Sequence, residues 1–221
     1  MDLVPSPEAR VPAGLTIRPL ASYALQPWRN GGGRTRSLAE GADGAWRISL
    51  AVVERDGPYS RFPDMDRLSL VVQGAGVDLR HAGNHITLEP GRAVEYDGAI
   101  DWQATLRGGP VIALNTMVAR ERFRSRVVPL HETTLVPTGS FALVLPLRGT
   151  CDWRTEDGTT ATPLASGCVI TRHIDGPDLL VAPLTDAVQT PLFPSASGAA
   201  VALVLIESLA QLNLRNEGNV T

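Results

Sequence analysis

The segment Leu68-Ser69-Leu70-Val71-Val72, with Gly74 two residues after it, decides the fold class of this chain. Leucine and valine favour a buried β-strand, and the glycine marks the turn that ends it. The same pattern returns at Phe141-Ala142-Leu143-Val144-Leu145, before Gly149. Short apolar strands separated by turns rich in glycine and proline, without a long amphipathic helix, predict an all-β protein with little helix.

The two halves of the chain repeat one another. A Leu-x-x-Gly turn, or its near equivalent, follows the strand pattern at 88–91 and again at 164–167, and an apolar strand closes each half at 111–114 and 201–206. This order is typical of a cupin, a small barrel or jelly roll whose open end holds a guest. We therefore predict a tandem cupin, or bicupin. An antiparallel sandwich with regularly spaced strands is the alternative.

The repeat divides the chain into three parts. Residues 1–14 carry three prolines and little apolar content, which predicts a loose N-terminal arm. Residues 15–122 form the predicted N-terminal cupin barrel, and residues 123–221 form a C-terminal cupin-like barrel. Because arginine, asparagine, tryptophan and glycine gather in the first half, we place the candidate pocket there and give the second barrel a supporting role.

The charge and cysteine content exclude several classes of protein. The 20 basic and 23 acidic residues give a net charge of -3, so no large positive field exists for nucleic acid. No apolar run approaches the roughly 20 residues needed to cross a bilayer, and the start lacks the features of a secretory signal. We expect a cytoplasmic protein that binds neither nucleic acid nor membrane. The two cysteines, Cys151 and Cys168, cannot form a disulfide scaffold and are expected to be reduced.

The histidines do not follow the usual cupin metal pattern. None of His81, His85, His131 and His173 belongs to a His-x-His motif, which normally supplies two of the imidazole ligands. His81 and His85 with Glu89 are the remaining combination that could hold a metal. We predict no metal and no other cofactor. No nucleophile and base stand at a recognisable spacing, so no catalytic residue is predicted and binding is favoured over turnover.

The glycine-rich stretch from Pro27 to Arg36 reads PWRNGGGRTR. Gly31 and Gly32 can bring backbone N–H groups close to a small guest, although a Gly-rich loop is often a plain connector. Asn30 adds an amide beside them. Trp28 either stacks on a planar guest or packs into the core.

Two polar residues alternate with apolar ones in the predicted strand that starts at Trp46. Arg47 and Ser49 share one face of this strand, opposite Trp46 and Ile48. If that face lines the barrel, the Arg47 guanidinium can hold a carboxylate with two hydrogen bonds. If it faces outward, Arg47 is an ordinary exposed arginine. The serine on the same face favours the inward orientation.

Four further residues complete the predicted ligand-binding set. Arg61 and Phe62 lie in a proline-bounded loop that could act as a lid. Arg67 and its neighbour Asp66 come just before the predicted strand that begins at Leu68, and a local salt bridge or turn cap is favoured over contact with a ligand. Asn115 ends an apolar strand, where it serves either as a pocket amide or in a bulge or turn.

Five motifs occur here in the order and spacing of a known family. They are Trp28–Gly33 with Thr35 and Arg36, Trp46–Ser49, Asp56–Pro63, Asp66-Arg67 and Leu114–Met117. Over residues 16 to 120 the chain resembles the HutD/Ves family of bicupin proteins. The resemblance implies a tandem β-barrel of bacterial origin, often linked with histidine degradation and without an established reaction. Arg29 stands where lysine is common in the family, and Tyr59 where phenylalanine is common.

These observations lead to three functional hypotheses. The favoured one is a metal-free protein that binds a small anionic metabolite of histidine breakdown, such as urocanate or formylglutamate, as a buffer or sensor. The alternative is a metal-independent enzyme, of the isomerase or hydrolase type, acting on the same compounds. A scaffold that works through protein contacts is the third. A homodimer is plausible in each case, because sheet edges and tandem barrels offer surfaces for one.

Overall fold

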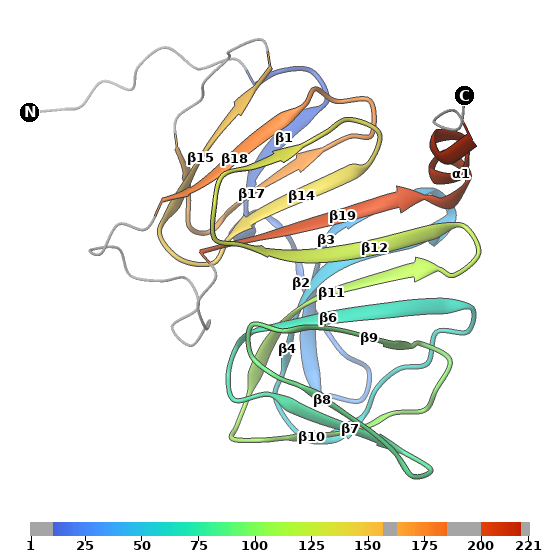
Figure 1. Cartoon of the computed structure of the whole chain (residues 1–221). Helices are drawn as coiled ribbons and strands as arrows, with labels where there is room; N and C mark the ends of the chain where they lie inside the picture. Colours follow the sequence, from blue (N-terminus) through green and yellow to red (C-terminus); the bar gives the residue numbers. More distant parts are fainter. Residues whose placement is uncertain (1–10, 157–162, 185–199, 218–221) are drawn as a thin grey trace, which may run out of the picture.

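The computed structural model describes residues 11–156, 163–184 and 200–217, which form two lobes made of β-strands (Figure 1). The larger sheet of each lobe faces the other lobe, and strands β6, β11, β12 and β19 follow one another across the middle of the molecule (Figure 1). The all-β prediction is confirmed, with α1 the single α-helix among the described residues.

The first lobe contains β2 (Leu25–Pro27), β3 (Gly33–Glu40), β4 (Trp46–Val53), β5 (Gly57–Pro58), β6 (Met65–Gln73), β7 (Val77–His81), β8 (Asn84–Leu88), β9 (Ala93–Asp97), β10 (Gln103–Leu106) and β11 (Val111–Ala119), with short 3-10 turns at Leu20–Ser22 and Ala42–Gly44. The second lobe contains β1 (Leu15–Pro19), β12 (Phe123–Leu130), β13 (Thr134–Val136), β14 (Phe141–Pro146), β15 (Thr150–Thr155), β16 (Leu164–Ala165), β17 (Cys168–Arg172), β18 (Leu179–Leu184) and β19 (Val201–Ser208), followed by α1 (Leu209–Glu217).

The strand orders of the two lobes match. The six-stranded sheet of the first lobe runs β2-β3-β4-β11-β6-β9, and the five-stranded sheet of the second runs β12-β19-β14-β17-β1. The smaller sheets run β5-β10-β7-β8 and β13-β18-β15-β16. Each strand from β4 to β11 therefore corresponds to the strand of the second lobe whose number is eight higher, so that β4 matches β12 and β11 matches β19. A duplicated unit requires this correspondence.

The first described strand does not join the lobe that follows it in the chain. Strand β1 pairs with β17 over its whole length, so it is the edge strand of the second lobe's larger sheet. The backbone of Gly14 reinforces this docking by accepting a hydrogen bond of 2.8 Å from the His173 amide. Residues 15–19 thus lie with the second lobe, although the sequence division groups them with the first. Most of the predicted N-terminal arm, residues 1–10, lies outside the described residues.

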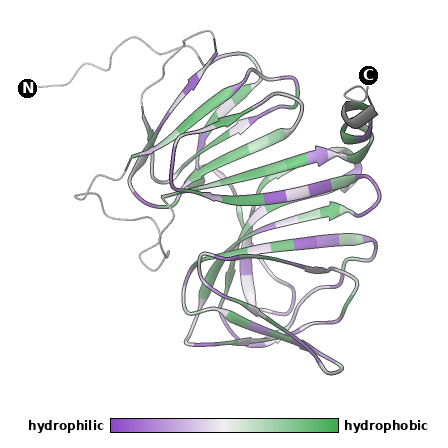
Figure 2. Cartoon of the chain, in the orientation of Figure 1, coloured by the Kyte–Doolittle hydropathy of each residue, from purple (hydrophilic) through white to green (hydrophobic). Residues whose placement is uncertain are grey.

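Three apolar cores hold the lobes together. One fills the first lobe and includes Val53 and Val71; a second fills the other lobe around Trp153. The third lies between the two larger sheets and joins Ile48 and Leu50 to side chains of the second lobe. Figure 2 shows hydrophobic residues concentrated along the strands of both lobes, with hydrophilic stretches on β6 and β12. The alternation along β4 therefore separates an inter-lobe face from a face inside the first lobe.

Gly33 is required where β3 begins, because a Cβ atom there would lie 2.2 Å from the carbonyl oxygen of Val52 and 3.2 Å from the Trp28 ring. Backbone cannot yield as a flexible side chain can, so Gly33→Ala is expected to reduce the free energy of unfolding by about 1–3 kcal/mol. Urea denaturation followed by fluorescence measures this loss. Gly32→Ala is the matched control, since its Cβ would meet only the movable Asn30 side chain at 3.2 Å. Equal stability of the two variants would contradict the prediction.

Within the described residues, no helix has the length and apolar character needed to cross a membrane.

Candidate functional site

The inward face of the first lobe's larger sheet is polar toward one end. Arg47 on β4 lies opposite Met117 on β11, which in turn lies opposite Arg67 on β6. Two residues further along the same strands, Ser49, Asn115 and Ser69 form a second row. Both rows share the face of Val53 and Val71, which belong to the first lobe's own core. The structure thus places Arg47 and Ser49 inward.

Arg67 is buried, with 6% of its surface exposed. Its Cζ atom lies 5.0 Å from the ring centroid of Tyr96, 5.2 Å from that of Tyr59 and 5.6 Å from that of Phe62. One Nη donates a long hydrogen bond of 3.4 Å to the Ser60 carbonyl, and Nε is buried without a partner. Aromatic faces attract a guanidinium but accept few of its five N–H donors.

The predicted salt bridge between Asp66 and Arg67 is wrong. Asp66 accepts a hydrogen bond of 2.7 Å from Arg120 instead. Neighbouring residues of a strand point to opposite faces of the sheet, so Asp66 points outward where Arg67 points inward. Among the described residues, Arg67 has no carboxylate within ion-pair distance.

Arg47 also approaches the Phe62 ring. Its Cζ is 5.6 Å from the Phe62 centroid, and one Nη lies 3.5 Å from the sulfur of Met117. Arg47 is half-buried and, like Arg67, is paired with no carboxylate in the described part of the chain. We call Arg47, Arg67, Tyr59, Phe62 and Tyr96 the arginine cluster.

A hydrogen-bonded chain lies behind the arginine cluster. Ser69 Oγ donates to Asn115 Oδ1 at 2.5 Å and lies 2.9 Å from the Tyr96 hydroxyl. Because the serine hydroxyl has one proton and gives it to Asn115, the Tyr96 hydroxyl must be the donor in the second bond. Asn115 Nδ2 donates to the carbonyl of Ala113 at 3.2 Å, which fixes the orientation of the amide. Asn115 is therefore a buried amide in the barrel interior, and its oxygen is already bonded.

Tyr59 is a neutral phenol in this environment. Burial raises the pKa of its hydroxyl well above the ordinary value, and the neighbouring Tyr96 raises it further, while the positive charge of Arg67 acts in the opposite direction. The arginine cluster thus holds two guanidinium groups among three uncharged aromatic rings. A cluster of this composition suits an organic anion, whose carboxylate would supply the missing acceptors.

The glycine loop lies at the opposite end of β4 from Arg47. Gly33 is opposite Val53 on β4, whereas Glu40 is opposite Arg47. Six residues of strand separate the two ends, or roughly 20 Å at about 3.3 Å per residue. The loop residues and the inward arginine are therefore not brought together at one mouth.

The polar groups of the glycine loop bond within the protein. Asn30 Oδ1 accepts from the Gly32 amide at 2.9 Å, and Asn30 Nδ2 donates to the Pro58 carbonyl at 3.2 Å. Gly31 has a φ of 65°, the left-handed conformation that glycine tolerates best. This loop fixes Pro58, and hence the neighbouring Tyr59 of the arginine cluster.

Trp28 connects the glycine loop with the arginine cluster through packing. Its indole N–H donates to Thr35 Oγ1 at 2.7 Å, and its ring meets Tyr59 edge to face with centroids 6.2 Å apart. Trp28 is partly buried against the core of the first lobe. Trp28 therefore packs against Tyr59 and helps to hold that ring in place.

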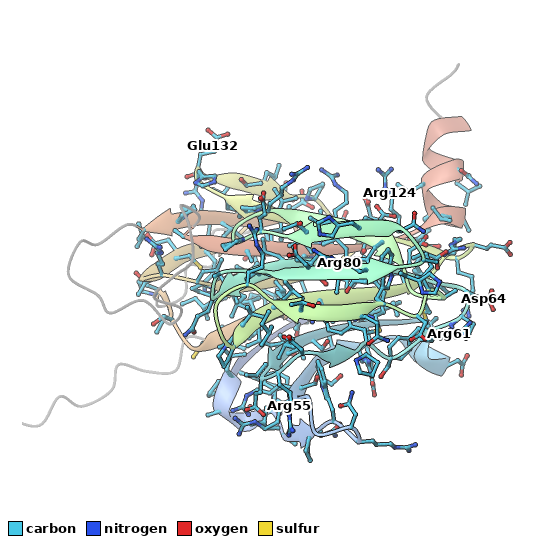
Figure 3. All side chains as sticks on the ribbon, turned by 90° about the horizontal axis from the view of Figure 1, so that it is seen from below. Arg55, Arg61, Asp64, Arg80, Arg124 and Glu132 are labelled. Atoms are coloured by element: carbon cyan, nitrogen blue, oxygen red, sulfur yellow. The ribbon has the colours of Figure 1, made fainter. Side chains whose placement is uncertain are left out.

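The two predicted lid residues, Arg61 and Phe62, differ in burial and in the groups they contact. Arg61 is exposed, lies near Asp64 at one end of the molecule in Figure 3, and donates to the Ala99 carbonyl at 2.9 Å. Phe62 is half-buried, and the Cζ atoms of Arg47 and Arg67 each lie 5.6 Å from its ring centroid. Of the pair, Phe62 alone belongs to the arginine cluster.

Sequence reasoning did not select Tyr59, Tyr96, Ser69 or Met117 as site residues. The inward face of β6 already offers a signal for Ser69, because it alternates with Arg67. Tyr96 has no such signal: it reaches the site because β9 pairs with β6 and places it opposite Arg67.

The histidines and cysteines are not among the residues that contact the arginine cluster. His81 Nδ1 lies 2.9 Å from the Asp101 carbonyl, and His85 Nε2 lies 3.2 Å from Asp78 Oδ1. In the described residues no group of three or more His, Cys, Asp or Glu side chains is arranged to hold a metal ion. Cys151 and Cys168 are both free, and burial raises the pKa of the Cys151 thiol to about 12.

The second lobe uses its buried arginine differently. Arg172 is fully buried, and its two Nη atoms donate to the carbonyls of Val136, Pro137 and Ser140 at 2.7–2.9 Å. The surrounding interior is apolar. Both Nη atoms of Arg172 are bonded to loop carbonyls and only its Nε lacks a partner, whereas Arg67 makes one long bond, so the first lobe is the better candidate for ligand binding.

Comparison with known proteins identifies the family. The family model described as HutD matches residues 20–181. An uncharacterised 21.2 kDa protein from the hutC 3' region of Pseudomonas putida is 36% identical over 111 residues, which cover 48% of this chain and 58% of the relative. Protein Ves of Citrobacter koseri is 33% identical over 107 residues, covering 45% of this chain and 56% of that protein. The chain thus spans little more than half the length of the curated relatives it matches.

Structural similarity covers more of the chain than these sequence alignments do. The structure of HutD from Pseudomonas fluorescens SBW25 (formate condition) superposes with a TM-score of 0.71 over 88% of this chain and 98% of that chain, at 20% identity. The resemblance seen in the sequence motifs is confirmed. The chain belongs to the HutD family and has its bicupin fold.

Proposed function

We propose that the first lobe binds a small organic carboxylate at the arginine cluster. The observation that carries this proposal is the state of Arg67: a buried guanidinium with one hydrogen bond of 3.4 Å, an unpaired Nε and no carboxylate partner in the described residues. A buried charge is costly unless it is paired. A carboxylate guest would supply that pair, and the half-buried Arg47 would add a second positive charge.

The aromatic rings favour a guest with a flat or apolar body. Tyr59, Phe62 and Tyr96 surround the guanidinium groups and offer ring faces and edges to the part of the guest beyond its carboxylate. Urocanate and formylglutamate are two acids of histidine breakdown. Urocanate combines a carboxylate with a flat ring, and formylglutamate combines carboxylates with an amide. The family's link with histidine degradation supports this choice, and a buffering or sensing role follows from binding without turnover.

The hydrogen-bonded chain favours binding over acid–base catalysis. It runs from Tyr96 through Ser69 and ends on the amide of Asn115, which neither accepts nor releases a proton near neutral pH. No histidine or carboxylate is bonded to this chain in the described part of the molecule. The alternative of a metal-independent isomerase or hydrolase would need a proton acceptor from elsewhere.

Isothermal titration calorimetry of the full chain with urocanate and with formylglutamate tests the proposal. We expect saturable heat from at least one acid at micromolar to millimolar concentration, and none from the ester in which every carboxylate of that acid is methylated. Arg124→Gln, an exposed position on β12 (Figure 3), is the control variant and should bind as the native protein does. No heat from either acid would overturn the proposal. Product signals in NMR spectra of the titrated mixture would instead favour the enzyme.

A further inference from the structure

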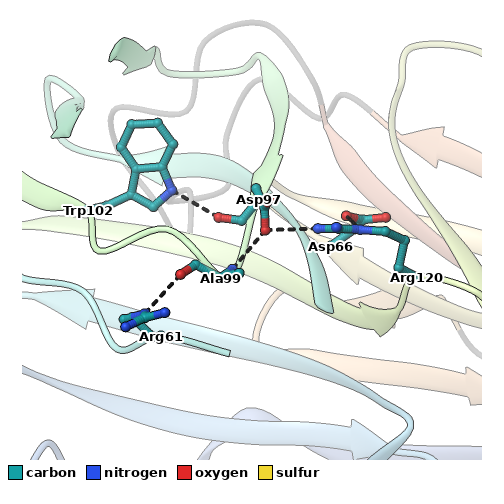
Figure 4. Close-up of polar contacts among 6 residues, drawn as sticks. All are labelled: Arg61, Asp66, Asp97, Ala99, Trp102 and Arg120. Carbon is teal, nitrogen blue, oxygen red and sulfur yellow. Dashed lines mark hydrogen bonds and ion pairs between the residues drawn. The ribbon is translucent and has the colours of Figure 1, made fainter. Parts of the chain in front are cut away.

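Two aspartates face one another beside the arginine cluster. Asp66 on β6 lies directly opposite Asp97 on β9. Like charges at such a pair of positions are destabilising. Arg120, just after β11, lies between them: its Nε donates to Asp66 at 2.7 Å and its Nη to Asp97 at 2.8 Å (Figure 4). The Arg120 guanidinium therefore bridges the two carboxylates and offsets their repulsion, and together they raise its pKa.

The same Asp97 carboxylate holds the turn that follows β9. Its Oδ1 accepts a hydrogen bond of 2.8 Å from the Ala99 amide, and its backbone carbonyl accepts one of 3.0 Å from the Trp102 indole (Figure 4). The Ala99 amide and the Arg120 guanidinium both lower the pKa of Asp97. The turn from Asp97 to Trp102 is thus anchored at both ends, and Arg120 fixes the carboxylate on which it depends.

This turn holds the segment that carries Phe62. The Gly98 carbonyl accepts a hydrogen bond of 2.7 Å from the Phe62 amide, and the Ala99 carbonyl accepts one of 2.9 Å from the Arg61 side chain. The two segments are packed closely, because a Cβ on Gly98 would lie 2.9 Å from the Phe62 carbonyl oxygen. The position of the Phe62 ring near the two guanidinium groups follows from that of the turn.

We propose that Arg120 is a positioning residue of the arginine cluster. By bridging Asp66 and Asp97 it fixes the Asp97–Trp102 turn, whose carbonyls hold the segment that brings the Phe62 ring to Arg47 and Arg67. Preorganisation of this kind improves affinity by reducing the ordering that binding requires. The consequence for affinity rests on the proposed function, whereas the effect on the Phe62 segment is independent of any ligand.

Amide hydrogen exchange on Arg120→Gln tests the positioning directly. We expect the Phe62 and Ala99 amides to exchange about tenfold faster or more, with the amide of Val71 in the core unchanged. Arg34→Gln is the matched control: its side chain is 48% exposed against 46% for Arg120, and it loses an ion pair with Glu54 on the same sheet. Exchange at Phe62 should be unaffected in the control.

A second substitution separates positioning from general destabilisation. Adding Asp66→Asn to Arg120→Gln removes the repulsion between the facing carboxylates, so protection at Phe62 should partly return. Unchanged exchange at Phe62 in Arg120→Gln, or equal acceleration at Val71, would overturn the inference. Should Arg120→Gln fail to fold, Arg120→Lys gives the same comparison, since an ammonium cannot bridge both carboxylates as the guanidinium fork does.

Urocanate titration of the same variants completes the test. Arg120→Gln is expected to bind urocanate about tenfold more weakly, with Arg34→Gln unchanged. If the native protein itself binds no urocanate, the proposed function fails while the exchange result still decides the role of Arg120. If the native protein binds and the exchange pattern does not change, the inference alone fails.

Discussion

Arg67→Met is expected to lose carboxylate binding and to keep or increase the stability of the free protein. Removing one partner of a buried charge pair generally costs about 2–5 kcal/mol, so the affinity for urocanate should fall by about 30-fold or more. The free protein loses a buried guanidinium with one long hydrogen bond and gains an unbranched apolar side chain among three aromatic rings. Sulfur–aromatic contacts are themselves favourable.

Calorimetry and urea denaturation of the same variant check both halves of this result. Arg67→Lys keeps the charge but loses the planar fork, so it should bind more weakly than the native protein without recovering its affinity fully. A large loss of stability in Arg67→Met would show that Arg67 serves the fold, and unchanged affinity would remove it from the site.

Arg172→Met is expected to have the opposite profile, with a large loss of stability and no direct effect on the ligand. The substitution leaves the carbonyls of Val136, Pro137 and Ser140 buried without their donors. Each buried carbonyl left without a donor costs about 1–3 kcal/mol, so a total loss of about 3 kcal/mol or more is expected. Burial lowers the pKa of Arg172 while Asp178 opposes this shift, which is consistent with a guanidinium held mainly by neutral carbonyls.

Thermal and urea denaturation measure this loss, with Arg154→Met as the control because Arg154 is exposed on β15 of the same lobe. Any remaining folded Arg172→Met protein should bind urocanate with native affinity, since the substitution is in the other lobe. A change in stability below about 1 kcal/mol, the usual range for surface positions, would contradict the structural role.

The sequence predicted the duplicated strands well because the signal for them is local. Turn glycines such as Gly74 and Gly149 bound the strands, and alternation along β4 separates Arg47 and Ser49 from Ile48 without reference to the rest of the chain. The strand orders of the two lobes match accordingly. The exception is β1, whose five residues join the second lobe through pairing with β17, more than 150 residues away in the chain.

The candidate site was predicted less completely because its contacts are not local. Trp28 and Asn30 were grouped with Arg47 on composition alone, whereas the register of β3 and β4 puts them at opposite ends of the sheet. Asp66 and Arg67 are sequence neighbours, yet the strand directs them to opposite faces. Tyr96 enters the site only through the pairing of β9 with β6.

By itself, then, the sequence determined the strands, their duplication and the family, because each of these is encoded in short runs of residues and their spacing. Only the tertiary structure decided which buried arginine is bonded to loop carbonyls through both Nη atoms and which makes one long hydrogen bond. Nothing within the immediate neighbourhood of Arg67 or Arg172 in the sequence distinguishes them. Their difference arises because three of the loop carbonyls bonded to Arg172 come from residues more than 30 positions away, while sheet pairing surrounds Arg67 with aromatic rings and leaves it one long hydrogen bond.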